Sequence, residues 1–261
     1  TILVTNKQVL NWSSHLKRIQ ESCETLDLPL IDIEQLCDWL ELALQDYFEQ
    51  NQTKDCVLKI IFTRGIGGVG YQVPKNSKPN CLFYLKPTPV NLLHSELLKP
   101  IQIGLCHTQA SIGSFAGIKT LNRLENVMAR TEMANQGFEE GLMLNALNHV
   151  VCGTQSNLYV IKGNTILTPH ISASGVAGTT RFKLNQLIPN LNLILKEKNI
   201  SLNDIEQADE LFFTNAVRGI QPVKQFLTTQ YSTEQTQKVD QAWSVWQAQN
   251  AVSVNHLKSV K

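Results

Sequence analysis

The sequence predicts an α+β protein with two domains, of which the second is the larger. Two amphipathic segments, residues 12–25 and 33–50, precede β-prone runs such as 56–62, as expected of helices packed on a mainly antiparallel sheet. Residues 107–117 are rich in Ser, Gly, Thr and Gln, which is typical of a connection between domains. Short strand-like runs and helical segments then follow one another through the rest of the chain.

The composition is typical of a soluble globular protein. The chain has 261 residues, 43% of them hydrophobic, and a net charge of +1, which argues against nucleic acid or an anionic membrane as the main partner. No apolar run reaches the roughly 18–20 residues that span a bilayer. The histidines show no metal-ligand spacing, so no metal site is predicted.

The cysteines are scattered and form no Cys-x-x-Cys pair. Several lie inside apolar runs, as Cys56 does before Val57 and Leu58. This distribution predicts reduced, mostly buried thiols in a cytoplasmic protein and no disulfide framework. The six positions are Cys23, Cys37, Cys56, Cys81, Cys106 and Cys152.

The first predicted domain covers residues 1–106, the connection covers 107–117, and the second domain covers 118–261. Since Thr1-Ile2-Leu3-Val4 already resembles the middle of a strand, we expect a natural segment before it. Predicted strands of the first domain lie at 1–10, 56–62, 81–85 and 101–106.

In the second domain, hydrophobic periodicity predicts three helices and several short strands. Lys162-Gly163-Asn164 has the composition of a hairpin turn. The helices are expected at 121–136, 178–196 and 233–249, and the strands at 141–144, 149–152, 158–161, 165–167 and 211–213.

Lys119 is the central candidate for chemistry. It lies between Gly117, which marks the end of the connection, and the start of a long amphipathic segment. Most lysines are solvated surface groups, so the residue alone proves nothing. Phosphate-binding patterns before and after Lys119 favour an imine-forming lysine that holds pyridoxal phosphate.

Two of these patterns precede or open a regular element. Arg64 ends a β-prone run and precedes a loop with four glycines, where a guanidinium could clamp a phosphate. Thr179 and Thr180 follow Gly178 at a predicted helix start, where first-turn N–H groups favour an anion. Taken singly, they also fit a surface arginine and ordinary helix capping.

Two further polar stretches follow or separate predicted strands. Thr214-Asn215-Ala216 comes directly after a buried strand and could offer backbone N–H groups to an anion, although a plain turn has the same composition. The stretch from Cys152 to Asn157 is a run of small polar residues between two β segments. Such a run suggests backbone that approaches a ligand closely.

Taken in order, these motifs resemble those of the fold-type IV pyridoxal-phosphate enzymes, which include branched-chain and D-amino-acid transaminases. Within that group they are most similar to the aminodeoxychorismate lyases. The resemblance covers nearly the whole chain. It rests on the stretches 63–71, 116–125 and 156–159, on Thr168-Pro169 with 175–178, and on Asn215-Ala216 with Pro222-Val223.

The resemblance implies a role for each matching residue. Lys119 would form the aldimine with the cofactor and then move protons, with its pKa lowered by burial near Arg64 and the cofactor. Arg64 would hold the phosphate together with backbone N–H groups of Thr179, Thr180 and Ala216. The other implied features are Asn215 beside cofactor and substrate, release of pyruvate from aminodeoxychorismate to leave para-aminobenzoate, a precursor in folate biosynthesis, and a homodimer.

One departure from the family pattern concerns Cys152. Five residues before the Asn of the Asn-Leu-aromatic motif, the family usually has a glutamate that pairs with the pyridine nitrogen. A neutral thiol is a weaker partner, so the electron sink would be shallower. The lyase is helped by formation of an aromatic ring, so Cys152 favours a lyase over a transaminase. A catalytically weakened cofactor-binding relative stays a third possibility.

A second departure concerns the substrate carboxylate. Relatives often carry an arginine in the connection, where this chain has Ser111, and no arginine occurs between Arg64 and Arg123. Arg218 or His107 could take that role, although Arg218 fits a solvated loop charge equally well.

Overall fold

The computed structural model describes residues 1–92 and 98–260, and the chain divides into two compact units. The first unit contains residues 1–94 and 247–261, and the second contains residues 95–246. These boundaries differ from the sequence-based division at 106/107 and 117/118. The difference arises because strands that are distant in sequence pair with one another in both units.

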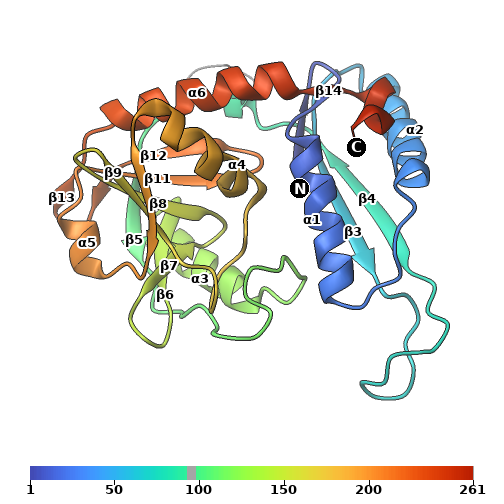
Figure 1. Cartoon of the computed structure of the whole chain (residues 1–261), viewed down its shortest axis with the longest axis horizontal. Coiled ribbons are helices and arrows are strands. Elements are labelled where there is room, and N and C mark those ends of the chain that lie inside the picture. Colours follow the sequence, from blue (N-terminus) through green and yellow to red (C-terminus); the bar gives the residue numbers. More distant parts are fainter. Residues whose placement is uncertain (93–97, 261) are drawn as a thin grey trace. The chain divides into compact units, whose positions relative to one another are not determined.

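The first unit is built on a five-stranded antiparallel sheet with the order β14-β2-β1-β3-β4 (Figure 1). Two long helices, α1 and α2, pack on this sheet through one apolar core. The elements are β1 (Ile2–Thr5), β2 (Gln8–Val9), α1 (Trp12–Thr25), α2 (Ile33–Asn51), β3 (Cys56–Thr63), β4 (Asn80–Lys86), η1 (Val90–Leu92), β14 (Val252–Ser253) and η3 (Val254–Ser259).

Local sequence explains where α2 begins and ends. Asp32 is its N-cap, and the carboxylate accepts hydrogen bonds from the N–H groups of Glu34 and Gln35. At the other end, Gln52 adopts a left-handed conformation that stops the helix. The buried face of α2 repeats at helical spacing through Leu36, Leu40, Leu44 and Phe48.

The last residues of the chain complete the first unit. Val252 pairs with Val9, which adds β14 to the edge of the sheet. The indole N–H of Trp12 donates to the backbone oxygen of Leu257 at 3.2 Å, and Leu257 is part of the same core. The prediction that placed this part of the chain in the second domain was therefore wrong, because Val252 and Leu257 have their partners at the start of the chain.

The second unit is built on a curled nine-stranded sheet. Its order is β10-β9-β8-β11-β12-β5-β6-β7, and β13 pairs with β12. The strands are β5 (Ile101–Leu105), β6 (Glu140–Leu144), β7 (Val150–Gly153), β8 (Asn157–Lys162), β9 (Thr165–Pro169), β10 (Ile194–Lys198), β11 (Glu210–Asn215), β12 (Gly219–Phe226) and β13 (Thr229–Gln230). The helices are α3 (Leu124–Asn135), α4 (Thr179–Leu187), η2 (Ile188–Leu191), α5 (Leu202–Glu206) and α6 (Glu234–Asn250), the last continuing beyond the unit.

Alternating side chains give this sheet two apolar faces. On β11, Leu211 and Phe213 belong to one core and Phe212 to another, as expected of a strand buried on both sides. The core that includes Phe212 also contains Leu184 of α4 and Trp243 of α6. A third, smaller core joins α3 to β6 and β7.

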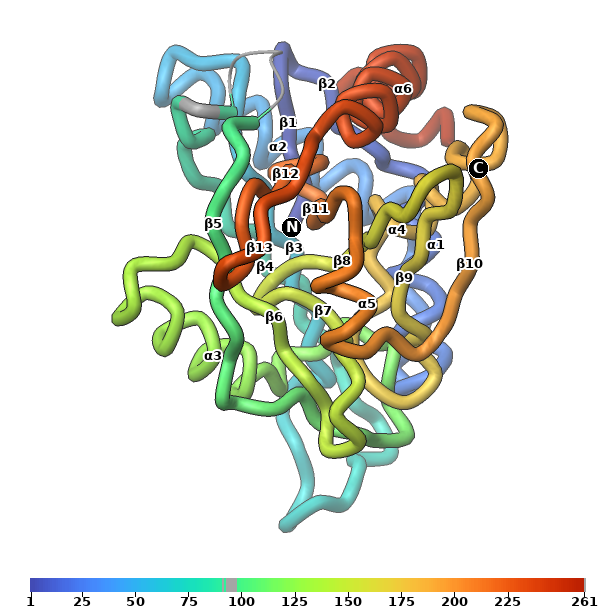
Figure 2. The backbone as a smooth tube through the Cα atoms, turned by 90° about the vertical axis from the view of Figure 1, so that its left-hand side faces the viewer, coloured from blue at the N-terminus to red at the C-terminus, as the bar shows by residue number. Residues whose placement is uncertain are grey.

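The expected helix over residues 178–196 is shorter than predicted. It ends at Leu187, a short 3-10 segment containing Pro189 follows, and Asn192 takes a left-handed conformation. Residues 194–198 then form β10, which lies parallel to β9 (Figure 2). Pro189 and Asn192 break the helix, and pairing with β9 turns the remaining residues into a strand.

β5 belongs to the second unit although it was predicted as part of the first domain. It pairs in parallel with β12 and with β6. The segment that follows it is also bound within the second unit, because Ala110 N–H donates to Leu144 O and Gly113 N–H donates to Ala173 O. Residues 107–117 are therefore not an interdomain connection.

Candidate functional site

The lysine segment, residues 117–119, is tied by backbone hydrogen bonds to the approach to α4. Gly117 N–H donates to Gly175 O at 3.0 Å, and Ala177 N–H donates to Gly117 O at 2.9 Å. Gly117 and Gly175 have φ values of +87° and +90°, which favour glycine at both positions. The backbone of Lys119 therefore lies two residues from this link.

Arg123 supports the lysine segment from the start of α3. Its Nη2 donates to Ile118 O at 2.5 Å, which holds the residue directly before Lys119. The Lys119 side chain itself is exposed in the second unit. The expectation that burial lowers its pKa therefore receives no support from the surroundings of Lys119 in this unit.

The start of α4 offers a group of donors. Gly178 is its N-cap, and Thr179 and Thr180 are buried in the first turn. The first N–H groups of a helix have no partner within it and favour an anion. Thr180 Oγ1 is buried and has no hydrogen-bond partner among the described residues. Buried polar groups are usually hydrogen-bonded, so this hydroxyl is a candidate ligand-binding group.

Asn157, the first residue of β8, fixes the backbone that leads into α4. Its Nδ2 donates to Val176 O at 2.8 Å, one residue from the link to Gly117. Its Oδ1 lies against Gly178 so closely that residue 178 has no room for a side chain. Asn157 thus connects the sheet, the lysine segment and the helix start.

The stretch Thr214-Asn215-Ala216 lies at the end of β11, beside Asn157. Thr214 and Asn157 are cross-strand partners. Asn215 Oδ1 accepts from the backbone N–H groups of Val217 and Arg218, at 3.0 and 2.7 Å, so this amide shapes the following turn. The structure therefore brings the predicted residues at 214–216 and 179–180 to the same end of the sheet.

Cys152 is buried on β7, opposite Met143 of β6, in the small core beneath α3. Burial raises the pKa of its thiol to about 12, with further increases from the nearby charges of Glu140 and Cys106. Arg123 acts in the opposite direction but more weakly. The thiol is therefore neutral at pH 7.

Glu140, which the sequence analysis did not select, is a buried carboxylate beside Cys152. It is 2% exposed and accepts hydrogen bonds from the N–H of Thr154 at 2.6 Å and the hydroxyl of Ser156 at 2.8 Å. These bonds fix the turn that joins Cys152 to Asn157. Its position at the start of an apolar strand could have indicated a buried carboxylate, but not its partners.

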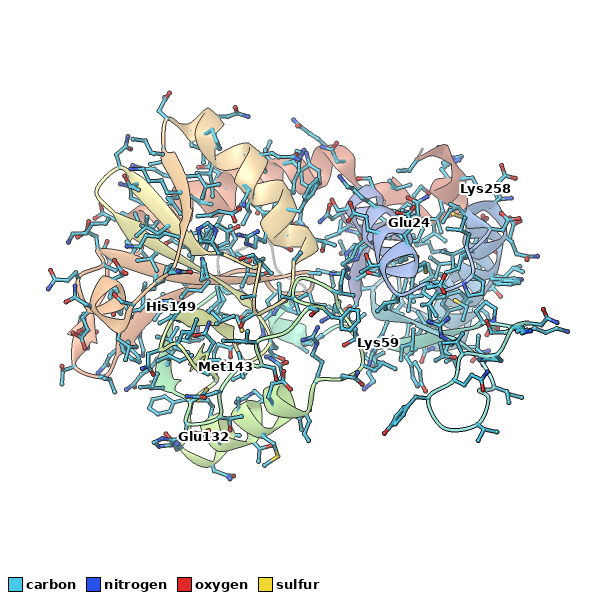
Figure 3. The ribbon with its side chains drawn as sticks, turned by 60° about the horizontal axis from the view of Figure 1, so that its bottom comes forward. Glu24, Lys59, Glu132, Met143, His149 and Lys258 are labelled. Atoms are coloured by element: carbon cyan, nitrogen blue, oxygen red, sulfur yellow. The ribbon has the colours of Figure 1, made fainter. Side chains whose placement is uncertain are left out.

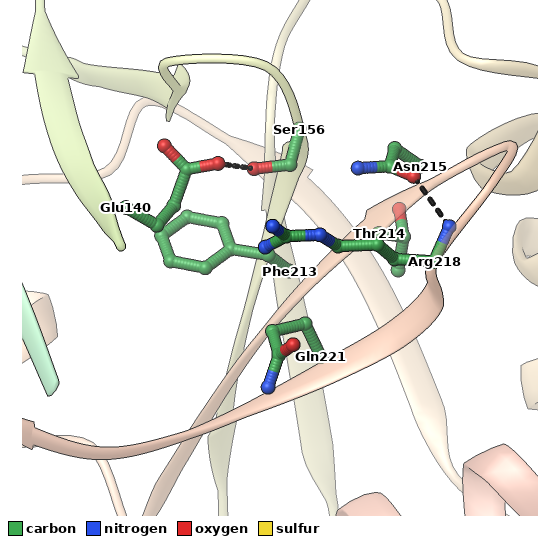
Figure 4. Close-up of a pocket in the computed structure, with 7 residues that line it drawn as sticks. All are labelled: Glu140, Ser156, Phe213, Thr214, Asn215, Arg218 and Gln221. Atoms are coloured by element: carbon green, nitrogen blue, oxygen red, sulfur yellow. Dashed lines mark hydrogen bonds between the residues drawn. The ribbon is translucent and has the colours of Figure 1, made fainter. Parts of the chain in front are cut away.

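A small pocket opens beside this carboxylate (Figure 4). The side chain of Arg218 reaches across the pocket toward Glu140, above Phe213. A partly buried arginine that lines a pocket is suited to bind a carboxylate. The lining residues are Glu140, Ser156, Phe213, Thr214, Asn215, Arg218 and Gln221.

His107 and Ser111 are placed differently from Arg218. The backbone N–H of His107 donates to the carboxylate of Glu132 at 2.7 Å, near the end of α3 (Glu132 is labelled in Figure 3). Since Glu132 lies nine residues beyond Arg123, His107 is about 13 Å along the helix from the support of the lysine segment. Ser111 is exposed. It lies in the loop in which the Gly113 N–H donates to Ala173 O.

Arg64 lies in the first unit, where it contacts the end of α1. Its Nη1 and Nη2 each donate at 2.5 Å, to the backbone oxygens of Asp27 and Leu26. A guanidinium has five N–H donors, so three remain after these bonds. Its role as a phosphate ligand stays a prediction.

Arg18 is a second arginine of the first unit that the sequence analysis did not select. Burial lowers its pKa to about 10, and it lies 3.3 Å from Nδ1 of His15, one turn earlier on α1. The described residues give Arg18 no carboxylate partner, so it is a candidate anion ligand. Arg18 lies beside the apolar face of α1, which includes Leu16, and this position in the helical pattern could have indicated a partly buried arginine.

The same structure bears on other classes of site. Within residues 1–92 and 98–260, no three His, Cys, Asp or Glu side chains gather as metal ligands. In that part of the chain, no helix is both long and apolar enough to cross a membrane.

Comparisons with known proteins identify relatives that are similar over most of the chain. The chain is 30% identical to an aminodeoxychorismate lyase of Vibrio harveyi, over 85% of this chain and 80% of that one. It is 28% identical to a putative branched-chain-amino-acid aminotransferase of Methanocaldococcus jannaschii, over 80% of this chain and 71% of that one.

Solved structures show the same likeness. A 4-amino-4-deoxychorismate lyase of Pseudomonas aeruginosa matches with a TM-score of 0.80 and 30% identity, over 92% of this chain and 87% of that one. A branched-chain aminotransferase of Escherichia coli matches with a TM-score of 0.81, over 94% of this chain and 84% of that one, and at 20% identity it shows the fold alone. The model of the amino-transferase class IV family matches residues 1–226. The chain therefore has the fold of the fold-type IV enzymes and belongs to the amino-transferase class IV family.

Proposed function

We propose that this protein is a pyridoxal-phosphate-dependent lyase that converts aminodeoxychorismate to para-aminobenzoate and pyruvate. The observation that carries the proposal is the buried, neutral thiol of Cys152, where the family resemblance expects a glutamate. Two relatives at 30% identity that bear the name of this lyase support it. Relatives named as aminotransferases make amino-group transfer the second candidate.

The residues of the second unit fit a phosphate-bearing cofactor. The first turn of α4 provides N–H groups at Thr179 and Thr180, and the Thr180 hydroxyl is buried without a partner among the described residues. The backbone of Ala216, one residue past β11, is proposed as a further donor. Arg64 is proposed as the charged ligand of the phosphate.

When bound, the cofactor supplies an electron sink for bonds at the substrate carbon. Lys119 provides the amine that holds the cofactor, and its Nζ accepts and returns protons during the reaction. An exposed lysine can meet an incoming substrate without local unfolding. The backbone links at Gly117 and Ile118 keep Lys119 beside the start of α4.

If Cys152 faces the ring nitrogen of the cofactor, as the family resemblance implies, it would set the depth of the electron sink. A thiol with a pKa of about 12 holds no charge at pH 7 and cannot stabilise a protonated pyridine nitrogen as a carboxylate does. Amino-group transfer depends strongly on such stabilisation. Elimination of pyruvate is helped by the aromatic ring that forms in the product, so it tolerates the neutral partner better.

Asn215 and Arg218 are the proposed substrate residues. Asn215 shapes the turn after β11, and Arg218 lines the pocket beside it. A guanidinium there can bind a substrate carboxylate. Ser111 and His107 are weaker candidates, since His107 is bound near the far end of α3.

The proposal is tested by pyruvate release from aminodeoxychorismate, with the visible spectrum recorded for the parent and for Lys119→Ala. Release by the parent alone, with loss of the cofactor band in the variant, is the expected result. Cofactor binding without release would favour amino-group transfer or a weakened relative. Transfer from D- or branched-chain amino acids to a keto acid then separates those two.

A homodimer in the cytoplasm completes the proposal. On α3, Leu124, Val127 and Met128 recur at spacings of three and four residues and are 73%, 59% and 52% exposed. An exposed apolar stripe of this kind is typical of an interface between subunits. The six free thiols are consistent with a reducing compartment.

A further inference from the structure

We propose that Cys106, Met133 and Met143 form a binding site for a soft monovalent metal ion such as Cu(I). The three side chains lie in the small core between α3 and the strands β5 and β6. The site combines one thiol with two thioethers. It therefore differs from clusters of three or more His, Cys, Asp or Glu side chains, none of which occurs among the described residues. The inference does not depend on the proposed function.

Sulfur atoms are concentrated in this core. The chain has three methionines, and Met133 and Met143 are both buried here, together with two of the six cysteines, Cys106 and Cys152. The other four cysteines lie in the first unit, which contains no methionine. A thiol and thioethers can therefore meet in this core but not in the core of the first unit.

Two of the sulfur atoms approach the same point beside Gly141 of β6. A Cβ built on Gly141 would collide with Met133 Sδ and would lie 2.9 Å from Cys106 Sγ. A Cβ built on Gly104 of β5 would likewise lie 2.8 Å from Met133 Sδ. The absence of a side chain at these two glycines leaves room for the thioether and the thiol to lie next to each other.

Met143 brings a third sulfur atom to the same face of the sheet. Leu105 pairs with Leu142, so Cys106 and Met143 are the next residues along two parallel strands. The Cys106 N–H donates to Leu142 O at 2.9 Å, which holds the chain together at this level. From α3, Asn126 Nδ2 contacts Met143 Sδ at 3.6 Å (Met143 is labelled in Figure 3). Met143 is therefore held between α3 and the residues that lead to Cys106.

The types of ligand select the ion. Thiolate and thioether sulfur are soft ligands, which favour Cu(I) over hard ions such as Mg²⁺ or Ca²⁺. Binding would displace the proton of the Cys106 thiol, and this proton passes to the solvent. The negative charge of the thiolate then balances the positive charge of a monovalent ion, so that no net charge is buried in the apolar core. Cys152 is the cross-strand partner of Met143, and we leave it out of the site because a second thiolate would bury a net negative charge.

Entry of an ion requires local movement of side chains. Methionine has three rotatable side-chain bonds and a polarisable sulfur, so both thioethers can turn toward an ion. Cys106 is 6% exposed, whereas Met133 and Met143 are fully buried, so an incoming ion meets the thiol first. The bound ion would join α3 to β6 and to the end of β5, and it should stabilise the second unit against unfolding.

The test measures how much Cu(I) the protein retains in excess glutathione, which competes for the ion with isolated thiols. We expect the parent to retain one ion per chain, and Met133→Leu and Met143→Leu to bind it at least about 10-fold more weakly. Groups that surround metal ligands already contribute about 10- to 100-fold to affinity, so a ligand should contribute no less. Both substitutions nearly conserve volume, so the fold should be kept. Equal retention by the parent and the two leucine variants would overturn the site.

Two cysteine variants test whether the position of the thiol matters. Cys106→Ala should lose the ion, and Cys56→Ala should keep it, because Cys56 is also buried but lies in the core of the first unit. Equal losses in these two variants would show that the ion binds thiols without the thioethers, and would contradict the proposal. X-ray absorption at the copper edge should show sulfur ligands alone. A parent protein that retains no Cu(I), or that binds it through nitrogen or oxygen, would also contradict the proposal.

Discussion

The amide oxygen of Asn157 occupies the space in which a side chain on Gly178 would begin. A Cβ built on Gly178 would lie 2.1 Å from Asn157 Oδ1. We therefore expect Gly178→Ala to displace either the Asn157 amide or the start of α4, at a cost of about 1–3 kcal/mol in unfolding free energy. Urea denaturation measures this cost, and weaker binding of pyridoxal phosphate should accompany it.

Two further variants make the Gly178 prediction specific. Gly113→Ala is the control, because a Cβ there meets nothing within 4 Å. Asn157→Ala in the Gly178→Ala background should recover part of the lost stability, since it removes the clash. Equal effects of the two glycine variants would show that the contact with Asn157 has no importance.

Glu140 is expected to be a main support of the turn that joins Cys152 to Asn157. Glu140→Ala leaves the N–H and hydroxyl of Thr154 and the hydroxyl of Ser156 without their acceptor. We expect a loss of about 3 kcal/mol or more in unfolding free energy, because each buried donor left without a partner costs about 1–3 kcal/mol. Ser156→Ala, which removes a single bond, should cost about 1 kcal/mol. Similar losses in both variants would contradict this role of Glu140.

Asp240 of α6 should make the protein less stable as pH rises from about 4 to about 6. Burial raises the pKa of its carboxyl from 3.8 to about 6, so folding favours the protonated form. This contribution is complete below the unfolded-state pKa and is lost as pH rises through the folded-state pKa. Asp240→Asn should therefore be more stable than the parent at pH 7, by at most about 3 kcal/mol, and similar to it at pH 3.5. Urea unfolding across this range would contradict the prediction if the difference did not change with pH.

The stripe of Leu124, Val127 and Met128 on α3 should lie in a subunit interface. Leu124→Glu or Met128→Glu would place a charge in that contact, so we expect either variant to sediment as a monomer where the parent sediments as a dimer. Gln237→Glu is the control, because Gln237 is exposed on a different helix, α6. A parent protein that is monomeric at micromolar concentration would contradict the prediction.

Local patterns in the sequence were enough for most helices and strands but not for the unit boundaries. The apolar repeat of residues 33–50 and the N-cap at Asp32 predict α2 closely, since both signals are local. The pairing of β14 with β2 joins Val252 to Val9, and no local pattern records a contact across that distance. The prediction of a helix over residues 194–198 was wrong for the same reason. These residues form a strand because they pair with β9, which lies elsewhere in the sequence.

The residues of the candidate site also fall into two groups, those that local sequence patterns predict and those that depend on distant partners. The glycine before Lys119 and the threonines after Gly178 were recognisable because turns and helix starts restrict residue type. Glu140 was missed because its importance comes from partners in another strand connection, at Thr154 and Ser156. The exposure of Lys119 depends on packing, which the motif around it does not specify.

The pairing of β14 with β2 has a consequence for synthesis on the ribosome. The first unit cannot finish its sheet edge or cover Trp12 until Val252 and Leu257 have been made. At about 5–20 residues per second, β1 and β3 would wait roughly 10 s or more for these residues after β3 is translated. During that time the nascent chain exposes an incomplete apolar core, so chaperone dependence should be greatest for the unit whose strands are made first.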